Sequence, residues 1–270
     1  MTASVRAACS VVAPPGRPYR QHPPTSAFYQ DLLAPFGVPF DEGLLRAGRN
    51  VSHQDLVDRL IEDDRVRSCA PELIIVSSAL PDVHPFTTVA SHLNMLVGGG
   101  TATSFGISEQ GLAGPFTALR IATSFADAGR CQQALIAVVE QTTLPGRFPL
   151  VHDNALVDSG VLLVLGTSDG LRVAGVETAA DPEQTTSRLA ELAGKDPERT
   201  LLVLGPWVAE SGLGERFNCQ QADPGCYGTS VWLVLAAQWQ AWQGNYDTVV
   251  LCDTEPRTGE GHLAILRSEP

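Results

Sequence analysis

The sequence predicts a layered α/β protein made of two similar halves, and three observations lead to this prediction. Several short runs of residues are almost purely apolar, which is typical of strands buried on both faces. Segments with apolar residues at helical spacing separate these runs. The same order of strands and helices then occurs twice along the 270 residues.

The apolar runs define the predicted strands. They lie at residues 73–76, 134–139, 161–165, 201–204, 249–252 and 263–266. Helices are predicted at residues 88–97, 112–126, 185–193 and 231–242. The last of these is apolar nearly all round, so we expect it to be buried on most sides. The pair Asp169-Gly170 between two apolar runs predicts a hairpin turn.

The internal repeat sets the expected domain organisation. In the first half, a glycine-containing turn opens a helix that ends near Gly129 and is followed by two strands. In the second half, a similar turn opens a helix that ends near Gly244, again followed by two strands. We therefore expect two fused halves, residues 1–168 and a shortened second half, residues 169–270.

Composition excludes several classes of protein. The net charge is −12, with 44% hydrophobic residues, 18% charged residues and a mean hydropathy of +0.03, so the chain is neither disordered nor a membrane bundle. An acidic chain lacks the basic surface that nucleic acids and anionic membranes attract, so we predict neither as a partner. Six scattered cysteines without a Cys-x-x-Cys pair predict reduced thiols, no metal, no cofactor and a cytoplasmic protein.

Three segments of the sequence resemble a known superfamily. Residues 104–122 carry a Gly-Leu-Ala-Gly-Pro-Phe turn that opens a helix, and residues 129–139 and 158–165 read as its following strands. Together they resemble the thiolase superfamily, most closely the ketoacyl-carrier-protein synthase III-like condensing enzymes. The resemblance implies a thiolase-like αβαβα layered fold. It is good over residues 72–168, weaker over 200–267 and poor before Glu72.

The resemblance also shows where this sequence departs from the family. The family's cysteine nucleophile stands at the start of the first central helix, where this chain has Leu112. Gly205 or Pro206 takes the place of the family's histidine, and Gly228 lies where its asparagine motif is interrupted. A leucine side chain cannot attack a thioester. The resemblance therefore implies a condensing-enzyme scaffold without the Cys-His-Asn set.

Four other residues are candidates for a different chemistry. Cys226 precedes the second central helix, where a helix dipole lowers a thiol pKa, although a small buried residue in a turn is the simpler interpretation. His152 and Asp153 are adjacent and suit acid–base catalysis, or else form a solvated loop cluster. Glu109 precedes Leu112 and is either a catalytic acid or part of a helix cap or interface.

Two functions follow as hypotheses. In the first, the chain is a catalytically silent ketosynthase-like subunit that pairs with a Cys-bearing ketosynthase homologue, or with itself, and shapes the active site. It resembles the silent subunits of heterodimeric alkylquinolone synthases and the chain-length factors of polyketide systems. Acyl-carrier protein or acyl-CoA would then be contacted through the partner. The alternative is a thiolase-fold acyltransferase or hydrolase with altered chemistry on an acyl thioester.

Overall fold

The computed structural model describes residues 3–167, 170–209 and 212–268. The strands are β1 (Ser4–Val12), β2 (Leu73–Ser78), β3 (Thr103–Ser108), β4 (Gln133–Glu140), β5 (Ser159–Gly166), β6 (Leu171–Ala179), β7 (Thr200–Leu204), β8 (Asn218–Gln221), β9 (Thr248–Thr254) and β10 (Gly261–Ser268). The helices are α1 (Pro23–Leu33), the 3-10 turn η1 (Ala34–Phe36), α2 (Glu42–Ala47), α3 (His53–Leu60), α4 (Asp64–Arg67), α5 (Val89–Val97), α6 (Ala113–Asp127), α7 (Pro149–His152), α8 (Pro182–Gly194), α9 (Leu213–Arg216) and α10 (Ser230–Trp242).

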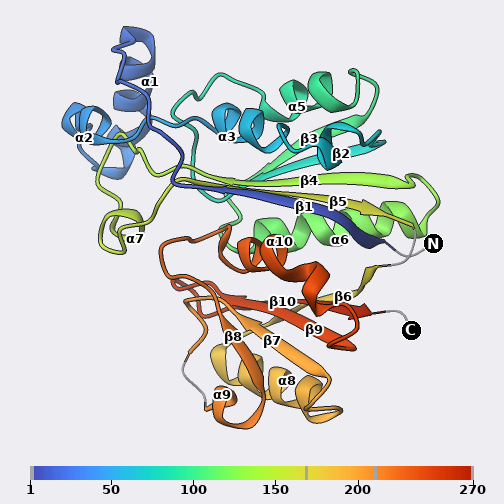
Figure 1. The fold of residues 1–270 in the computed structure, drawn as a ribbon. Helices are drawn as coiled ribbons and strands as arrows, with labels where there is room; N and C mark the ends of the chain where they lie inside the picture. Colours follow the sequence, from blue (N-terminus) through green and yellow to red (C-terminus); the bar gives the residue numbers. More distant parts are fainter. Residues whose placement is uncertain (1–2, 168–169, 210–211, 269–270) are drawn as a thin grey trace.

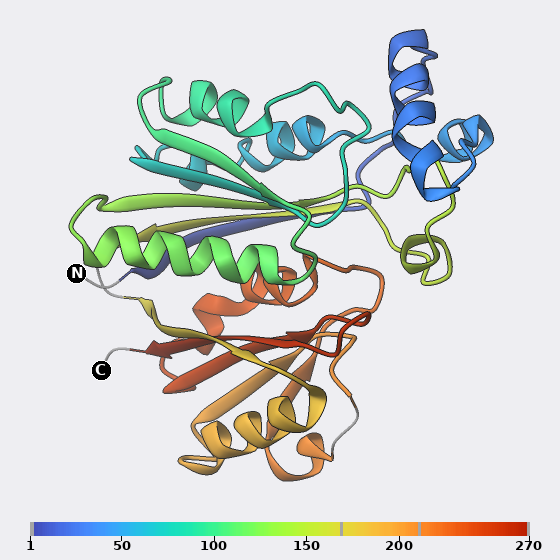
Figure 2. The same cartoon turned by 180° about the vertical axis from the view of Figure 1, so that it is seen from behind.

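Helices and strands alternate in five layers (Figure 1, Figure 2). Helices α3 and α5 cover the outer face of strands β1–β5, and α8 covers the outer face of β6–β10. Helices α6 and α10 lie in the central layer, between the two groups of strands. The predicted α/β class with an αβαβα arrangement is therefore observed, and each predicted strand and helix lies within an element of the same type.

The strand order is the same in both halves when it is followed outward from the centre. The whole sheet has the order β3-β2-β4-β5-β1-β6-β10-β9-β7-β8. Only two residue pairs, Ser4 with Arg172 and Val5 with Leu171, join β1 to β6 at the middle. The proposed boundary between residues 168 and 169 falls outside the described residues and stays a prediction.

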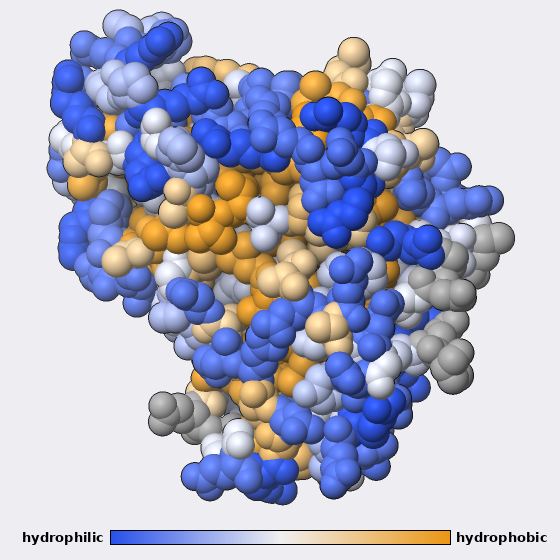
Figure 3. All heavy atoms as spheres, viewed as in Figure 1, coloured by the Kyte–Doolittle hydropathy of each residue, from blue (hydrophilic) through white to orange (hydrophobic). Residues whose placement is uncertain are grey.

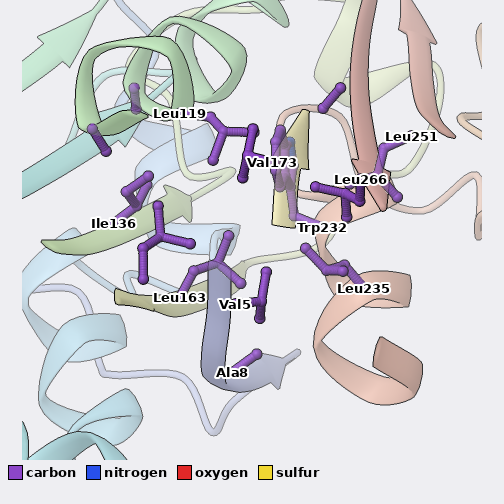
Figure 4. Packing of buried hydrophobic residues seen from close by; sticks show 14 of the residues in the cluster. Val5, Ala8, Leu119, Ile136, Leu163, Val173, Trp232, Leu235, Leu251 and Leu266 are labelled. Atoms are coloured by element: carbon purple, nitrogen blue, oxygen red, sulfur yellow. The ribbon is translucent and has the colours of Figure 1, made fainter. Parts of the chain in front are cut away.

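The two central helices pack against both groups of strands. Phe116 of α6 meets Trp232 of α10 edge to face, with ring centroids 5.0 Å apart. Figure 4 shows Ile136 and Leu163 on one side of this layer and Leu251 on the other. One continuous core therefore spans the halves, and the central helices form its middle.

Strands β1, β6 and β8 were not predicted from the sequence. The search relied on continuous apolar runs, whereas β1 contains Arg6 and β6 alternates buried with exposed residues through Arg172 and Glu177. Half-exposed strands have this pattern. The predicted hairpin at Gly170 is also wrong, because β1 lies between β5 and β6 in the sheet, and Asp169 is outside the described residues.

Helix α10 is less buried than its composition suggested. Trp232, Leu235 and Trp239 are buried, but Gln238 and Gln240 are exposed. The helix is confirmed, whereas its burial on most sides is not, because one side of the central layer reaches solvent. On the face of the molecule that carries β1 and α10, apolar side chains reach the surface in a band across the middle (Figure 3).

We expect Trp232→Ala to destabilise the whole chain, because the 2% exposed indole fills the core between both groups of strands. Large-to-small substitutions of buried aromatic residues cost about 3–5 kcal/mol. Urea denaturation followed by circular dichroism measures the change. The control is Gln240→Ala on the exposed side of the same helix, which should leave the midpoint nearly unchanged. Equal midpoints for the two variants would contradict this packing.

Candidate functional site

The starts of the two central helices meet at the place where the resemblance puts an active site. Leu112 is the N-cap residue of α6 and is 2% exposed. Its side chain belongs to an apolar cluster that fills this region. The cluster's buried members are Leu80, Leu112, Leu144, Val151, Leu156 and Tyr227. The position of the family's nucleophile is thus occupied by packed hydrocarbon.

Glu255, which follows β9, binds the start of α6. Its carboxylate accepts hydrogen bonds from the backbone N–H of Leu112 (3.3 Å) and from the hydroxyl of Tyr227. The Nε of Arg257 donates to the other carboxylate oxygen over 2.9 Å. Burial raises the pKa of Glu255, but these donors outweigh burial and leave the pKa lowered overall. Gly111 has a φ of +52°, and a Cβ there would collide with this carboxylate.

Glu140, the last residue of β4, binds the segment that leads into α10. Its carboxylate is fully buried and accepts the backbone N–H groups of Tyr227 (2.9 Å) and Gly228. Burial raises the pKa of Glu140 to about 7, against the opposing effect of the two N–H donors. The nearby charges of Asp158 and Asp253 raise it further.

Asp253, near the end of β9, binds the first residue of α10. It is 1% exposed and accepts hydrogen bonds from the hydroxyl of Ser230 (2.7 Å) and the N–H of Thr254 (2.9 Å). Burial raises the pKa of Asp253 to about 7. Its carboxyl group lies so close to Gly205 that a Cβ at that position would overlap it. The position of the family's histidine therefore has no room for a side chain, and Pro206 beside it is half-buried.

Glu140, Asp253 and Glu255 form what we call the carboxylate cluster. Sequence reasoning missed all three, although a signal was present. Glu140 directly follows the apolar run 134–139, and Asp253 directly follows the run 249–252 in the second half. An acidic residue at the carboxyl end of a buried strand, repeated in both halves, is the pattern that could have found the cluster.

Cys226 differs from the sequence expectation. It is 2% exposed and lies four residues before α10 begins at Ser230, so it is not in the first turn of the helix. Burial raises the pKa of its thiol to about 11, although hydrogen bonds with Ser159 and Thr229 act in the opposite direction. The expected lowering of the pKa was wrong, because desolvation of the thiolate outweighs the helix dipole.

The other candidate residues are not brought together. The Nδ1 of His152 accepts the backbone N–H of Phe148 (3.1 Å), while Asp153 forms an exposed ion pair with Arg147. No hydrogen bond joins His152 to Asp153 in the described part of the chain, so they do not form a catalytic pair here. Glu109 is exposed at the end of β3, with a left-handed backbone (φ +63°).

Metal-binding and membrane-spanning features were also sought. Within residues 3–167, 170–209 and 212–268, no three His, Cys, Asp or Glu side chains gather in a way that could bind a metal ion. No helix in those ranges combines the length and apolar character needed to cross a bilayer.

Comparison with known proteins gives similarity in structure but not in sequence. No family model and no curated sequence match the chain. A 3-oxoacyl-(acyl carrier protein) synthase III, FabH, from Pseudomonas aeruginosa matches at 14% identity and TM-score 0.63, over 100% of this chain and 99% of its own. OleA from Xanthomonas campestris matches at 14% identity and TM-score 0.68, over 99% and 98%.

These matches establish the fold class. The chain has a thiolase-like fold of the condensing-enzyme type, like FabH and OleA, along its whole length. The sequence resemblance was expected to be poor before Glu72, but at the level of the fold the match includes that region. A further structure of the Xanthomonas OleA, with bound lauric acid and lauroyl-CoA, matches at 13% identity and TM-score 0.66.

The carboxylate cluster predicts how stability depends on pH. Glu140 and Asp253 have folded-state pKa values raised to about 7 from ordinary values of 4.5 and 3.8. The folded chain therefore binds more protons than the unfolded chain between pH 5 and pH 7, so the free energy of unfolding falls as the pH rises through 7. We expect a lower urea midpoint at pH 8 than at pH 6.

The double variant Glu140→Gln, Asp253→Asn should flatten this dependence, because neither amide titrates. Asp127→Asn, at an exposed position of α6, is the control and should keep the slope. A wild-type midpoint that stays level or rises between pH 6 and pH 8 would show that the two carboxyl groups do not have raised pKa values.

Proposed function

We propose that the chain is a catalytically silent ketosynthase-like subunit. It pairs with an active condensing enzyme and shapes that enzyme's active site, in a cytoplasmic pathway that builds polyketide-type or fatty-acid-type metabolites. The observation that carries the proposal is Leu112, a buried leucine packed at the start of α6. In condensing enzymes of this type the nucleophile stands at that position, and leucine supplies no nucleophile.

The surroundings of Leu112 support the same proposal. The N–H of Leu112, which would stabilise a thiolate at a helix start, already donates to Glu255. Gly205 cannot carry a general base, since the carboxyl group of Asp253 occupies the space. At Gly228 the backbone N–H binds Glu140. Each position implied for the catalytic set is therefore used to bind a carboxylate or to make room for one.

The free edge at β3 supports pairing with another chain. Strand β3 lies at the end of the sheet, pairs with β2 and has the uncharged sequence Thr-Ser-Phe-Gly-Ile-Ser. On the neighbouring helix α5, Met95 is 68% exposed and Leu96 is 44% exposed. Edge strands that face solvent are usually protected by charged residues, so an uncharged edge beside apolar side chains is typical of an interface.

The partner in this proposal is a Cys-bearing ketosynthase homologue, with a homodimer as the other possible assembly. Acyl-carrier protein or acyl-CoA would be contacted through the partner's active site. The alternative function, an acyltransferase or hydrolase of altered chemistry, finds less support. The thiol of Cys226 has a pKa of about 11, and His152 accepts a backbone N–H instead of contacting Asp153.

The pairing is tested by co-expression with a Cys-bearing condensing enzyme encoded beside this chain. Size exclusion with light scattering should give a 1:1 complex. The double variant Thr103→Lys, Met95→Lys adds charge to the β3 edge and should weaken the complex at least tenfold. The control is Gln240→Lys, which adds charge to the exposed side of α10. Separate species for the wild-type chains would contradict the proposed pairing.

Acylation is tested by intact-mass spectrometry after incubation with acyl-CoA. We expect no adduct on the wild-type chain. We also expect none on Leu112→Cys, because Glu255 disfavours a thiolate beside it and position 205 carries no base. The Cys-bearing partner serves as the positive control. A wild-type adduct that Cys226→Ala abolishes would replace the silent subunit with the enzymatic alternative.

A further inference from the structure

Two cavities adjoin beside helix α1, which projects from the body of the molecule (Figure 1). Their volumes are about 680 and 720 Å³, and both lie within the range of small-molecule sites. Both are lined by Tyr29, His84, Pro85 and Thr87. We call the two together the N-terminal groove.

The smaller cavity is the apolar half of the groove. Phe28 and Leu32 of α1 line it from one side, and Leu80 and Ile107 line it from the sheet. Leu32 is 46% exposed, so apolar surface faces water along this helix. Phe86, at the mouth of the neighbouring cavity, is 65% exposed and stacks on Phe28 with ring centroids 5.1 Å apart. Covering such surface is favourable, at about 25 cal/mol per Å².

The larger cavity is the cationic half of the groove. Arg17, Arg20, His22 and His84 line it, and none of its lining residues in the described chain is acidic. This is notable in a chain with 30 acidic and 18 basic residues. Arg17 forms an ion pair with Asp55, which lies outside the lining. The guanidinium of Arg20 has no hydrogen bond or ion pair among the residues that the structure describes.

A buried histidine adds a second observation. His53 lines the apolar half and is 4% exposed, and within the described residues its Nε2 has no hydrogen-bond partner. Buried polar atoms are nearly always partnered, so an unpartnered one marks a place for a ligand or a water molecule. The acidic Asp82 also lines this half, but it already accepts hydrogen bonds from the N–H of His53 and the hydroxyl of Thr87.

We propose that the N-terminal groove binds a small amphiphilic anion, with a carboxylate or phosphate group at Arg17 and Arg20 and an alkyl chain in the apolar half. Guanidinium groups form strong charge-assisted hydrogen bonds with both kinds of anion. An apolar chain would cover Leu32 and pass close to His53. This inference is independent of the silent-subunit function, because it concerns a different part of the chain.

Isothermal titration of the purified chain with monomeric decanoate and decyl phosphate tests the proposal. Decanol, which has the same chain and no charge, should bind at least tenfold more weakly. Arg20→Gln should weaken decanoate binding about tenfold without unfolding the chain, because this side chain is exposed. Leu32→Ser should weaken binding of both anions. Arg147→Gln is the control, since Arg147 is exposed and pairs with Asp153 away from the groove.

Three outcomes would overturn the proposal. Equal binding of decanol and decanoate would show that the cationic half contributes nothing. Unchanged affinity in Arg20→Gln would place the anion elsewhere. Binding to vesicles that contain an anionic lipid, without binding to monomeric decanoate, would make the groove a membrane contact instead. None of these results affects the pairing experiment, which measures a complex with another protein.

Discussion

The structure depends on buried carboxylates that cross between the two halves. Glu140 comes from the first half and binds the N–H groups of Tyr227 and Gly228, which lead into α10 of the second. Glu255 comes from the second half and binds the N–H of Leu112 at the start of α6 in the first. The first N–H groups of a helix have no partner within the helix. Each half thus supplies a carboxylate that the central helix of the other half needs.

This exchange explains why two halves joined by only two strand pairs share one core. The strand contact between β1 and β6 is short, so it contributes little by itself. The packing of Phe116 on Trp232 and the reciprocal carboxylates hold the central layer together instead. Both interactions need both halves to be folded at once, which favours a single cooperative unit over two independent domains.

Much of the fold could be predicted from the sequence, since fully buried strands such as β4 and β9 consist of continuous apolar runs. Strands β1 and β6 escaped because residues such as Arg6 and Glu177 interrupt their apolar pattern on the exposed side. The site was harder to predict. Leu112 could be located through the resemblance, but the roles of Glu140 and Asp253 depend on contacts 88 and 23 residues away in the chain. The raised thiol pKa of Cys226 likewise depends on burial that spacing does not show.

The close approach of Asp253 to Gly205 has an evolutionary consequence. A histidine could enter position 205 only after Asp253 had been replaced, and that replacement would leave the hydroxyl of Ser230 without its buried acceptor. A cysteine at position 112 would in turn need Glu255 to change. Each first step costs stability and yields no activity by itself. The present sequence therefore stands on a local fitness peak, from which a return to condensing chemistry would require several substitutions together.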